Sequence, residues 1–203
     1  MTPPEALDRG LDQLAFEFPG GARDKLLQYV ALLEKWNRTF NLTAIRNPVE
    51  MVSHHVLDSL AVAPHLRLPA GGRLADVGSG AGLPGIPLAI ARPDWVVTLN
   101  DSNTKKTAFL RQASIELRLA NVAVHEGRAQ EWRPAQLFSA VISRAFAELS
   151  EFIAACRHLI APGGMLVAMK GVAPIAPEGT RTIRLNVPLL AAERHLVLVP
   201  VGS

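Results

Sequence analysis

The amino-acid sequence predicts an α/β fold, in which a Rossmann-like parallel sheet is covered by helices and preceded by an N-terminal helical cap. Three observations support this prediction. Apolar runs of strand length alternate with helical stretches from residue 73 onward, a glycine-rich loop at 76–82 follows the first run, and residues 1–70 carry helical patterns only. Alternation of this kind is typical of βαβ units, whose strands are parallel and covered by helices on both faces.

The N-terminal part is predicted to contain three helices. The clearest covers 22–37, where apolar residues recur at helical spacing, namely at Leu26, Leu27, Val30, Leu33 and Trp36. A second helix is expected over 48–63, because Pro48 suits a first helical turn and apolar residues follow at helical spacing. A shorter helix is expected over 5–18.

A helix-breaking run of Leu, Pro, Ala, Gly and Gly at 68–72 separates this part from the rest. We therefore expect a helical cap at 1–70 and a Rossmann-like domain at 71–203. In that domain a turn at Pro162-Gly163-Gly164 is expected to lead into the fifth strand. Strands are predicted at 73–77, 95–100, 122–125, 138–143 and 165–170, helices at 85–91, 104–119 and 149–160, and an antiparallel edge pair at 181–187 and 194–200.

The composition is that of a globular protein, since 49% of the 203 residues are hydrophobic and 19% are charged. The single cysteine, Cys156, excludes an internal disulfide and is expected to be a buried thiol. A net charge of +3 permits a nucleic-acid partner without requiring one. The N-terminus lacks the pattern of a signal peptide and no apolar run is long enough to span a bilayer. We expect a cytoplasmic monomer with no membrane partner.

The strongest functional motif is the loop Asp76-Val77-Gly78-Ser79-Gly80-Ala81-Gly82. Alternating glycines directly after a strand let the backbone turn sharply and approach a ligand closely. The spacing of Gly80, Gly82 and Gly85 also satisfies the dinucleotide-binding pattern. Two features favour a different ligand: counted from Gly78, directly after the strand, the last glycine of that pattern is replaced by Leu83, and an acid precedes the loop at Asp76.

A carboxylate at Asp76 would repel a pyrophosphate but would tolerate a sulfonium cation that carries an α-ammonium group. The loop therefore favours S-adenosylmethionine as the cofactor and a methyltransferase as the class of enzyme. A nicotinamide-dependent oxidoreductase on the same type of sheet is the alternative enzyme. The cofactor-binding candidates in this part of the chain are Asp76, Gly78, Gly80 and Leu83.

Further candidates follow the second and third strands. Asp101 ends the second strand, where a carboxylate accepts hydrogen bonds from ribose hydroxyls, although an aspartate is also common in turns; its position favours the ribose role. Ser102 and Asn103 follow it and are expected to add contacts. Ala129 and Gln130 lie either at an adenine edge or at the start of a helix, and both interpretations stay open.

Two basic residues follow the fourth and fifth strands. Because ligands collect at the carboxyl ends of parallel strands, Arg144 is expected to face the active cleft, where it could hold a cofactor carboxylate, an RNA phosphate or a guanine edge. Lys170 occupies the equivalent place after the fifth strand and is the second candidate for RNA contact. His54, His55 and Asp58 do not extend into a cluster with metal-ligand spacing, so no metal site is expected.

The motifs together resemble those of the family of small-subunit ribosomal RNA methyltransferase G, also called glucose-inhibited division protein B. The resemblance covers most of the chain in the expected order. The matching stretches are 29–46 (YVALLEKWNRTFNLTAIR), 55–60 (HVLDSL), 76–90 (DVGSGAGLPGIPLAI), 101–110, 143–146 (SRAF), 169–171 and 193–198 (ERHLVL).

This resemblance implies a class I methyltransferase that transfers a methyl group from S-adenosylmethionine to N7 of guanine 527 in 16S rRNA. It also implies that Gly78, Leu83, Ala129, Gln130 and Arg144 bind the cofactor and that the turn at 101–103 binds its ribose. The implied partner is 16S rRNA or the 30S subunit. Guanine N7 bears a lone pair and no proton, so no residue is assigned as a general acid or base.

Two departures from the family pattern stand out: Gln130 replaces a frequent glutamate, and the stretch between Gly171 and Leu189 is shorter than usual. A non-catalytic RNA-binding module that kept the fold is the second alternative.

Overall fold

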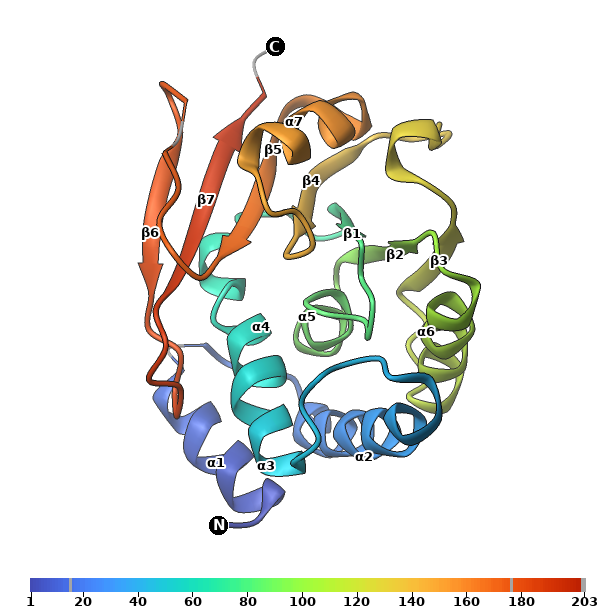
Figure 1. The fold of residues 1–203 in the computed structure, drawn as a ribbon, viewed down its shortest axis with the longest axis vertical. Coiled ribbons are helices and arrows are strands. Elements are labelled where there is room, and N and C mark those ends of the chain that lie inside the picture. Colours follow the sequence, from blue (N-terminus) through green and yellow to red (C-terminus); the bar gives the residue numbers. More distant parts are fainter. Residues whose placement is uncertain (15, 176, 202–203) are drawn as a thin grey trace.

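The protein forms one seven-stranded sheet with the strand order β3-β2-β1-β4-β5-β7-β6 (Figure 1). The structure is a computed structural model that describes residues 1–14, 16–175 and 177–201. Strands β1 to β5 run parallel, and β7 runs antiparallel to both of its neighbours, β5 and β6. The strands are β1 (Arg73–Val77), β2 (Val96–Asp101), β3 (Val122–Glu126), β4 (Phe138–Ser143), β5 (Ile160–Lys170), β6 (Arg181–Leu185) and β7 (Arg194–Pro200).

The helices between the strands follow the predicted order. They are α5 (Gly85–Ala91), which has the predicted bounds, and α6 (Thr104–Glu116) and α7 (Leu149–Cys156), which end earlier than predicted. Single 3₁₀ turns lie at Ala129–Glu131, between β3 and β4, and at Arg157–Leu159, directly before β5. Asn103 precedes α6 and its side chain accepts hydrogen bonds from the N–H groups of Lys105 and Lys106, which fixes the start of that helix. Cys156 is fully buried, as predicted.

The cap contains α1 (Pro3–Gln13), α2 (Ala22–Phe40) and a composite helix in place of the one predicted over 48–63. That composite consists of α3 (Pro48–Met51), a wider π-helical turn (Val52–Leu57), α4 (Asp58–Leu60) and a 3₁₀ turn (Ala63–His65). The helix predicted over 5–18 starts and ends earlier, and residue 15 of that range lies outside the described residues. No helix in the described ranges has the length and apolarity needed to cross a membrane.

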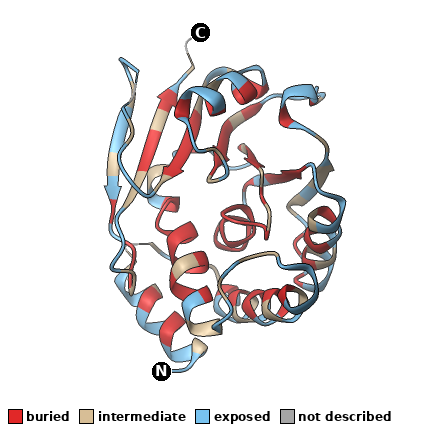
Figure 2. Cartoon of the chain, in the orientation of Figure 1, coloured by how far each residue is buried: buried red, intermediate tan, exposed pale blue. Residues whose placement is uncertain are grey.

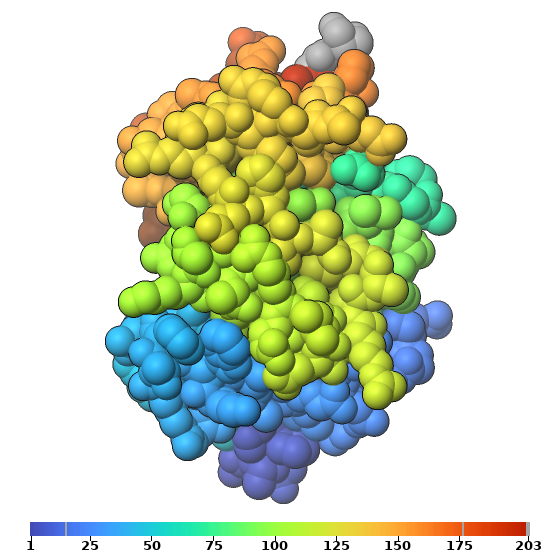
Figure 3. Space-filling view, turned by 90° about the vertical axis from the view of Figure 1, so that its right-hand side faces the viewer, coloured from blue at the N-terminus to red at the C-terminus, as the bar shows by residue number. Residues whose placement is uncertain are grey.

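Helices cover both faces of the sheet (Figure 2). One face carries Leu74, Leu99 and Ile142, which pack into a core shared with the cap, α5 and α6. The opposite face carries Val77, Val141 and Leu166, which pack against α7. In the space-filling view the blue segment of α2 lies against the green segment that includes α6 (Figure 3). The cap is therefore held by the same apolar core as the sheet.

The C-terminal half of the sheet differs from the prediction in one respect. The antiparallel edge pair is present, with β7 next to β5 and β6 at the edge. The predicted turn at 162–164 is instead part of β5, which starts at Ile160. The register explains the difference: Phe138 lies opposite Ile160 while Ala140 lies opposite Met165, so β5 carries extra residues there. An irregularity of this kind keeps strand pairing on both sides of the glycines.

Candidate functional site

The loops that follow β1, β2, β3 and β4 surround a cavity of about 310 Å³ at the carboxyl edge of the sheet, which we call the sheet cavity. Five of the residues predicted from the sequence line it, although they are far apart in the chain. These five are Gly78, Asp101, Ser102, Ala129 and Gln130. Asn100, Gly127 and Phe146 complete part of the wall.

A smaller cavity of about 160 Å³ adjoins it on the cap side of the glycine loop, and we call it the loop cavity. The two cavities share Gly78 and Ala145. The loop cavity is lined by residues 78–81, by Leu83 and Arg144, and by Leu42 and Thr43 of the cap. It therefore gathers Gly80 and Leu83, two further loop residues that the sequence singled out.

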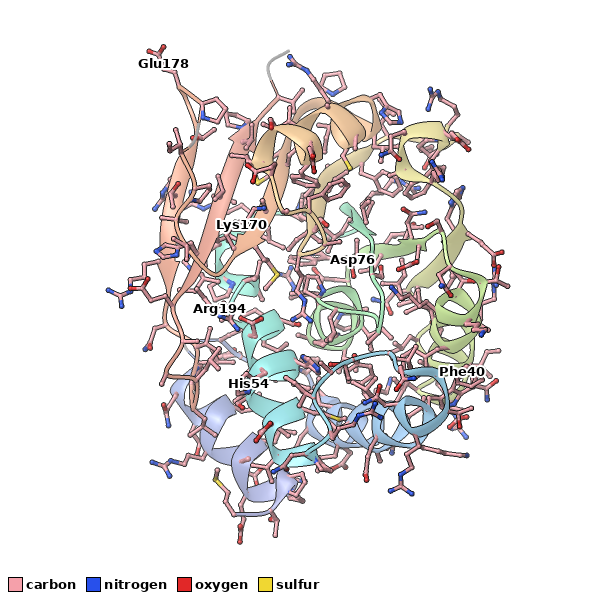
Figure 4. All side chains as sticks on the ribbon, in the orientation of Figure 1. Phe40, His54, Asp76, Lys170, Glu178 and Arg194 are labelled. Atoms are coloured by element: carbon pink, nitrogen blue, oxygen red, sulfur yellow. The ribbon has the colours of Figure 1, made fainter. Side chains whose placement is uncertain are left out.

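A third cavity of about 360 Å³ lies between the cap and β5, and we call it the cap cavity. Figure 4 shows three of its lining residues, Lys170, Arg194 and His54, between the end of β5 and the cap helix. Arg144 lines both the loop cavity and the cap cavity. Arg144 is therefore a wall residue that the two cavities share.

The glycine loop is held in a conformation that only glycine adopts readily. Gly78, Gly80 and Gly82 have positive φ values of 70°, 58° and 87°. The N–H of Gly80 donates to Oδ2 of Asp101 at 2.9 Å, while Oδ1 of Asp101 accepts from the N–H of Asn103 at 2.9 Å. Asp101 thus joins the first and second loops of the sheet cavity, besides lining that cavity.

Asp76 lies elsewhere than the sequence argument assumed. Its side chain is completely buried under α5, and Oδ2 accepts a hydrogen bond from the N–H of Gly85 at 2.8 Å. Oδ1 has no hydrogen-bond partner among the described residues. The side chain lines none of the three cavities. Asp76 therefore supports the start of α5 beneath the loop rather than lying with the other predicted residues.

Burial raises the pKa of Asp76 to about 7, and the Gly85 N–H opposes this shift. At a pH between these two values, the Asp76 carboxyl is protonated in the folded protein and ionised in the unfolded chain, where its pKa is near 3.8. The contribution of Asp76 to the free energy of unfolding is largest below the pKa of the unfolded chain. It falls as the pH rises through the pKa of the folded protein. From pH 5 to pH 8 we expect a fall of about 3 kcal/mol.

Urea denaturation of the wild type and of Asp76→Asn across that pH range measures this contribution. The difference between the two proteins in free energy of unfolding should change with pH by the expected amount, because asparagine does not titrate there. A pH-independent difference would contradict the assignment.

Four of the other predicted residues also belong to local structural arrangements. Asn103 caps α6 and lines none of the three cavities. Ala129 and Gln130 are the first two residues of a 3₁₀ turn and also line the sheet cavity, and their contact with an adenine edge stays a prediction. Lys170 donates from Nζ to the carbonyl oxygens of Phe146 and Ala147, at 2.5 and 2.7 Å, and so holds the loop after β4.

Arg144 is anchored by the cap. Its Nη1 donates to Oδ2 of Asp58 at 3.2 Å and, at 3.5 Å, to the carbonyl oxygen of His54. Oδ1 of Asp58 accepts from Nε of Arg194 at 3.0 Å. Sequence reasoning missed Asp58 and Arg194 as members of the site. Both fall within matching stretches of the family pattern, which was the one available signal.

The cap also supplies the wall formed by the segment after α2. Buried Asn37 donates to the carbonyl oxygen of Ile45 and accepts from the N–H of Thr43. Thr43 Oγ1 lies 2.8 Å from Nε2 of His55, and the hydroxyl of Tyr29 donates to the carbonyl oxygen of Ala81 at 2.7 Å. The Tyr29 bond fixes the cap against the glycine loop, and the other three contacts hold the segment after α2 within the cap. Among the described residues no group of His, Cys, Asp and Glu is arranged to hold a metal ion.

Comparison with known proteins gives the class of enzyme that the sequence motifs predicted, a methyltransferase. The family model described as rRNA small subunit methyltransferase G matches residues 22–180. The chain belongs to this family. It is 56% identical to the ribosomal RNA small subunit methyltransferase G of Burkholderia ambifaria, over 89% of this chain and 85% of that one. The protein of the same name from Burkholderia lata is 51% identical, over 98% of this chain and 92% of the relative.

A solved structure supports the fold. A SAM-dependent methyltransferase from Aquifex aeolicus superimposes with a TM-score of 0.58 over 85% of this chain and 98% of that one, at 16% sequence identity. The predicted family and the class I methyltransferase fold are thereby confirmed, and with the family the predicted S-adenosylmethionine-dependent enzyme class. The matches do not support the two alternatives, a nicotinamide-dependent oxidoreductase and a non-catalytic RNA-binding module.

Proposed function

We propose that the protein transfers a methyl group from S-adenosylmethionine to N7 of guanine 527 in 16S rRNA. The observation that supports this most directly is the position of Arg144, which lines both a cavity built on the glycine loop and a second cavity lined by cationic side chains. A donor in one cavity and a nucleotide in the other would both lie against Arg144. The family relatives named above act on small-subunit rRNA by their names.

Bound S-adenosylmethionine supplies a methyl group on a sulfonium, which is transferred without a redox partner. Positive φ at Gly78 and Gly80 turns the loop so that backbone groups line the cavity. The wall at Gly78 has no Cβ, and one added there would lie 2.6 Å from Cβ of Ala145. A backbone surface of this kind fits the close approach of a ligand. We propose that the loop cavity takes the amino-acid end and the sheet cavity the adenosine end.

The residue roles follow from this division. Asp101 and Ser102 would contact the ribose, and Ala129 with Gln130 the adenine edge, where the Gln130 amide oxygen accepts a hydrogen bond as a carboxylate would. Around the amino-acid end lie Gly78, Gly80, Leu83 and Arg144. Arg144 and Lys170 are the residues proposed for RNA binding. Lys170 would contribute by holding the loop after β4 in place.

No proton transfer is needed at guanine N7, so the protein's task is to align the nucleophile with the methyl group and to exclude water. This is consistent with a site whose titratable groups hold backbone segments in place. Asp101 fixes Gly80, and Lys170 fixes the loop after β4. No described residue is assigned a catalytic acid or base role.

We further propose that the chain acts on 16S rRNA or the 30S subunit as a monomer in the bacterial cytoplasm. Residues 1–70 would form the cap and 71–203 the methyltransferase domain. Labelled methyl transfer to naked 16S rRNA and to 30S subunits, followed by borohydride and aniline cleavage at the methylated guanine and primer extension to the cleavage site, tests the proposal. The expected result is one modified guanine, at position 527. Binding of S-adenosylhomocysteine without transfer to either substrate would overturn it.

A further inference from the structure

Asp58 is a cap carboxylate that pairs with two arginines from distant parts of the chain. The residue is only 3% exposed, and its oxygens accept from Arg144 Nη1 at 3.2 Å and from Arg194 Nε at 3.0 Å. Arg144 follows β4 and Arg194 begins β7. A buried carboxylate shared in this way fixes the orientation of both guanidinium planes, since each bond is charge-assisted and directional.

The cap cavity, which Asp58 and both arginines line, carries an excess of positive charge. Its wall includes three cationic side chains, Arg144, Lys170 and Arg194, against one carboxylate, Asp58. His55 also lines the wall and is neutral at pH 7, because burial and the nearby Arg144 lower its pKa to about 4. A concave surface with this balance favours an anionic group.

The arginines keep hydrogen-bond donors for such a group. Arg144 donates to protein acceptors through Nη1, whereas Arg194 uses Nε toward Asp58 and Nη1 toward the carbonyl oxygen of Glu193. Within the described part of the chain, Nη2 of neither arginine has a hydrogen-bond partner. Lys170 differs, since its ammonium group is engaged by two carbonyl oxygens.

The chemistry of the transfer distinguishes a phosphate from the base as the anchor. Methylation at N7 moves positive charge from the sulfonium to the guanine, so a guanidinium on the base edge opposes the developing charge. A guanidinium on a phosphodiester avoids that cost and forms charge-assisted bonds. Two arginines that share one carboxylate are therefore better suited to the RNA strand than to the reacting base.

We infer that Asp58 is a positioning residue that holds Arg194 and Arg144 as a pair on a phosphate of the RNA strand beside the target base. The inference rests on the proposed RNA substrate. Arg144 also lines the loop cavity, whereas Arg194 lines only the cap cavity of the three. Arg194 is for that reason the residue that separates RNA binding from cofactor binding.

Steady-state methylation of 16S rRNA by Arg194→Ala tests the phosphate contact. We expect the KM for RNA to rise about tenfold and the salt slope of RNA affinity to fall by about one, as for the loss of one phosphate contact. The kcat and the affinity for S-adenosylhomocysteine should stay within about twofold of wild type, an experimental tolerance of about 0.4 kcal/mol. Arg184→Ala is the matched control, because Arg184 lies on the neighbouring strand β6, is 72% exposed and pairs with Glu193.

Asp58→Asn tests the positioning role. Its amide has one acceptor oxygen for two guanidinium groups. The KM for RNA should rise, and adding Arg194→Ala to this variant should raise it little further, because the two residues act as one unit. Additive effects, or a lowered folded fraction by circular dichroism with an unchanged KM, would show a merely structural role. If Asp58→Asn does not fold, the comparison of Arg194→Ala with Arg184→Ala still decides the phosphate contact. Asp58→Glu, which keeps the charge, then replaces Asp58→Asn in the double-variant comparison with Arg194→Ala.

Three further outcomes overturn the inference. An unchanged KM and salt slope in Arg194→Ala, with an active wild type, refutes it and leaves the proposed function intact. A fall in kcat with an unchanged salt slope places Arg194 on the base instead of the phosphate. A wild type that methylates no RNA refutes the proposed function, and the inference falls with it.

Discussion

Replacing Arg144 with alanine is expected to lower kcat/KM for methyl transfer by about 100-fold, equivalent to about 2.7 kcal/mol. The physical reason is its position, since Arg144 lines the loop cavity and the cap cavity and so stands between the proposed donor and acceptor. Misplacement of either reactant by about 1 Å is enough for a loss of this size. Labelled methyl transfer to 16S rRNA measures it.

Stability should fall much less than activity in this variant. Without Arg144, buried Asp58 keeps its bond to Arg194, so we expect the free energy of unfolding to drop by about 1–3 kcal/mol. Urea denaturation measures that drop. Arg38→Ala is a suitable control, since Arg38 is 74% exposed and pairs with Glu34 on the surface. Loss of the folded state at the assay temperature would make Arg144 a structural residue.

Arg144→Lys adds a second level to this test. Lysine keeps the charge but has no planar group that can reach Asp58 and a ligand at once. Activity between that of wild type and Arg144→Ala is expected. Activity equal to wild type would mean that only the charge matters.

The sheet cavity could largely be predicted from the sequence because it depends on local patterns and one topological rule. Each parallel strand ends at the same edge, so residues that follow β1, β2 and β3 meet there whatever their separation in the chain. Gly78, Asp101 and Ala129 all line that cavity for this reason. Their roles toward a cofactor stay predictions, whereas their proximity is a property of the fold.

The cap cavity could not be predicted in this way. It depends on how a helix of the cap packs on the sheet, and the apolar stripe of that helix does not say which polar residue lies over which strand. Asp58 reaches Arg194 across 136 residues of sequence. No local signal records such a contact, and the family pattern marked both residues without joining them.

The position of the Asp76 side chain could have been predicted from strand geometry, although the argument from charge did not use it. Side chains of a strand alternate between faces, so Asp76 shares the face of Leu74, which packs into the core under the helices. The argument from charge used only the position of the carboxylate before the loop and did not consider which face of the strand it occupies. The alternation instead places it under α5, where it accepts from Gly85.

Gly78→Ala is expected to reduce the affinity for S-adenosylhomocysteine by more than about tenfold. Two costs add at this position. A positive φ of 70° costs an L-residue about 1–2 kcal/mol. The new Cβ would also lie 2.6 Å from Cβ of Ala145, so the loop after β4 must move. That movement displaces Ala145 and the adjoining Arg144, which line the loop cavity with Gly78.

Gly80→Ala separates these two costs. Gly80 has a similar φ of 58°, but the nearest atom to an added Cβ is the carbonyl oxygen of Gly78 at 3.9 Å. The two variants should therefore lose similar stability from backbone strain, while only Gly78→Ala moves the wall shared by the sheet and loop cavities. Calorimetry with S-adenosylhomocysteine measures the difference. Equal losses of affinity would show that strain in the loop, and not the space at Gly78, controls binding.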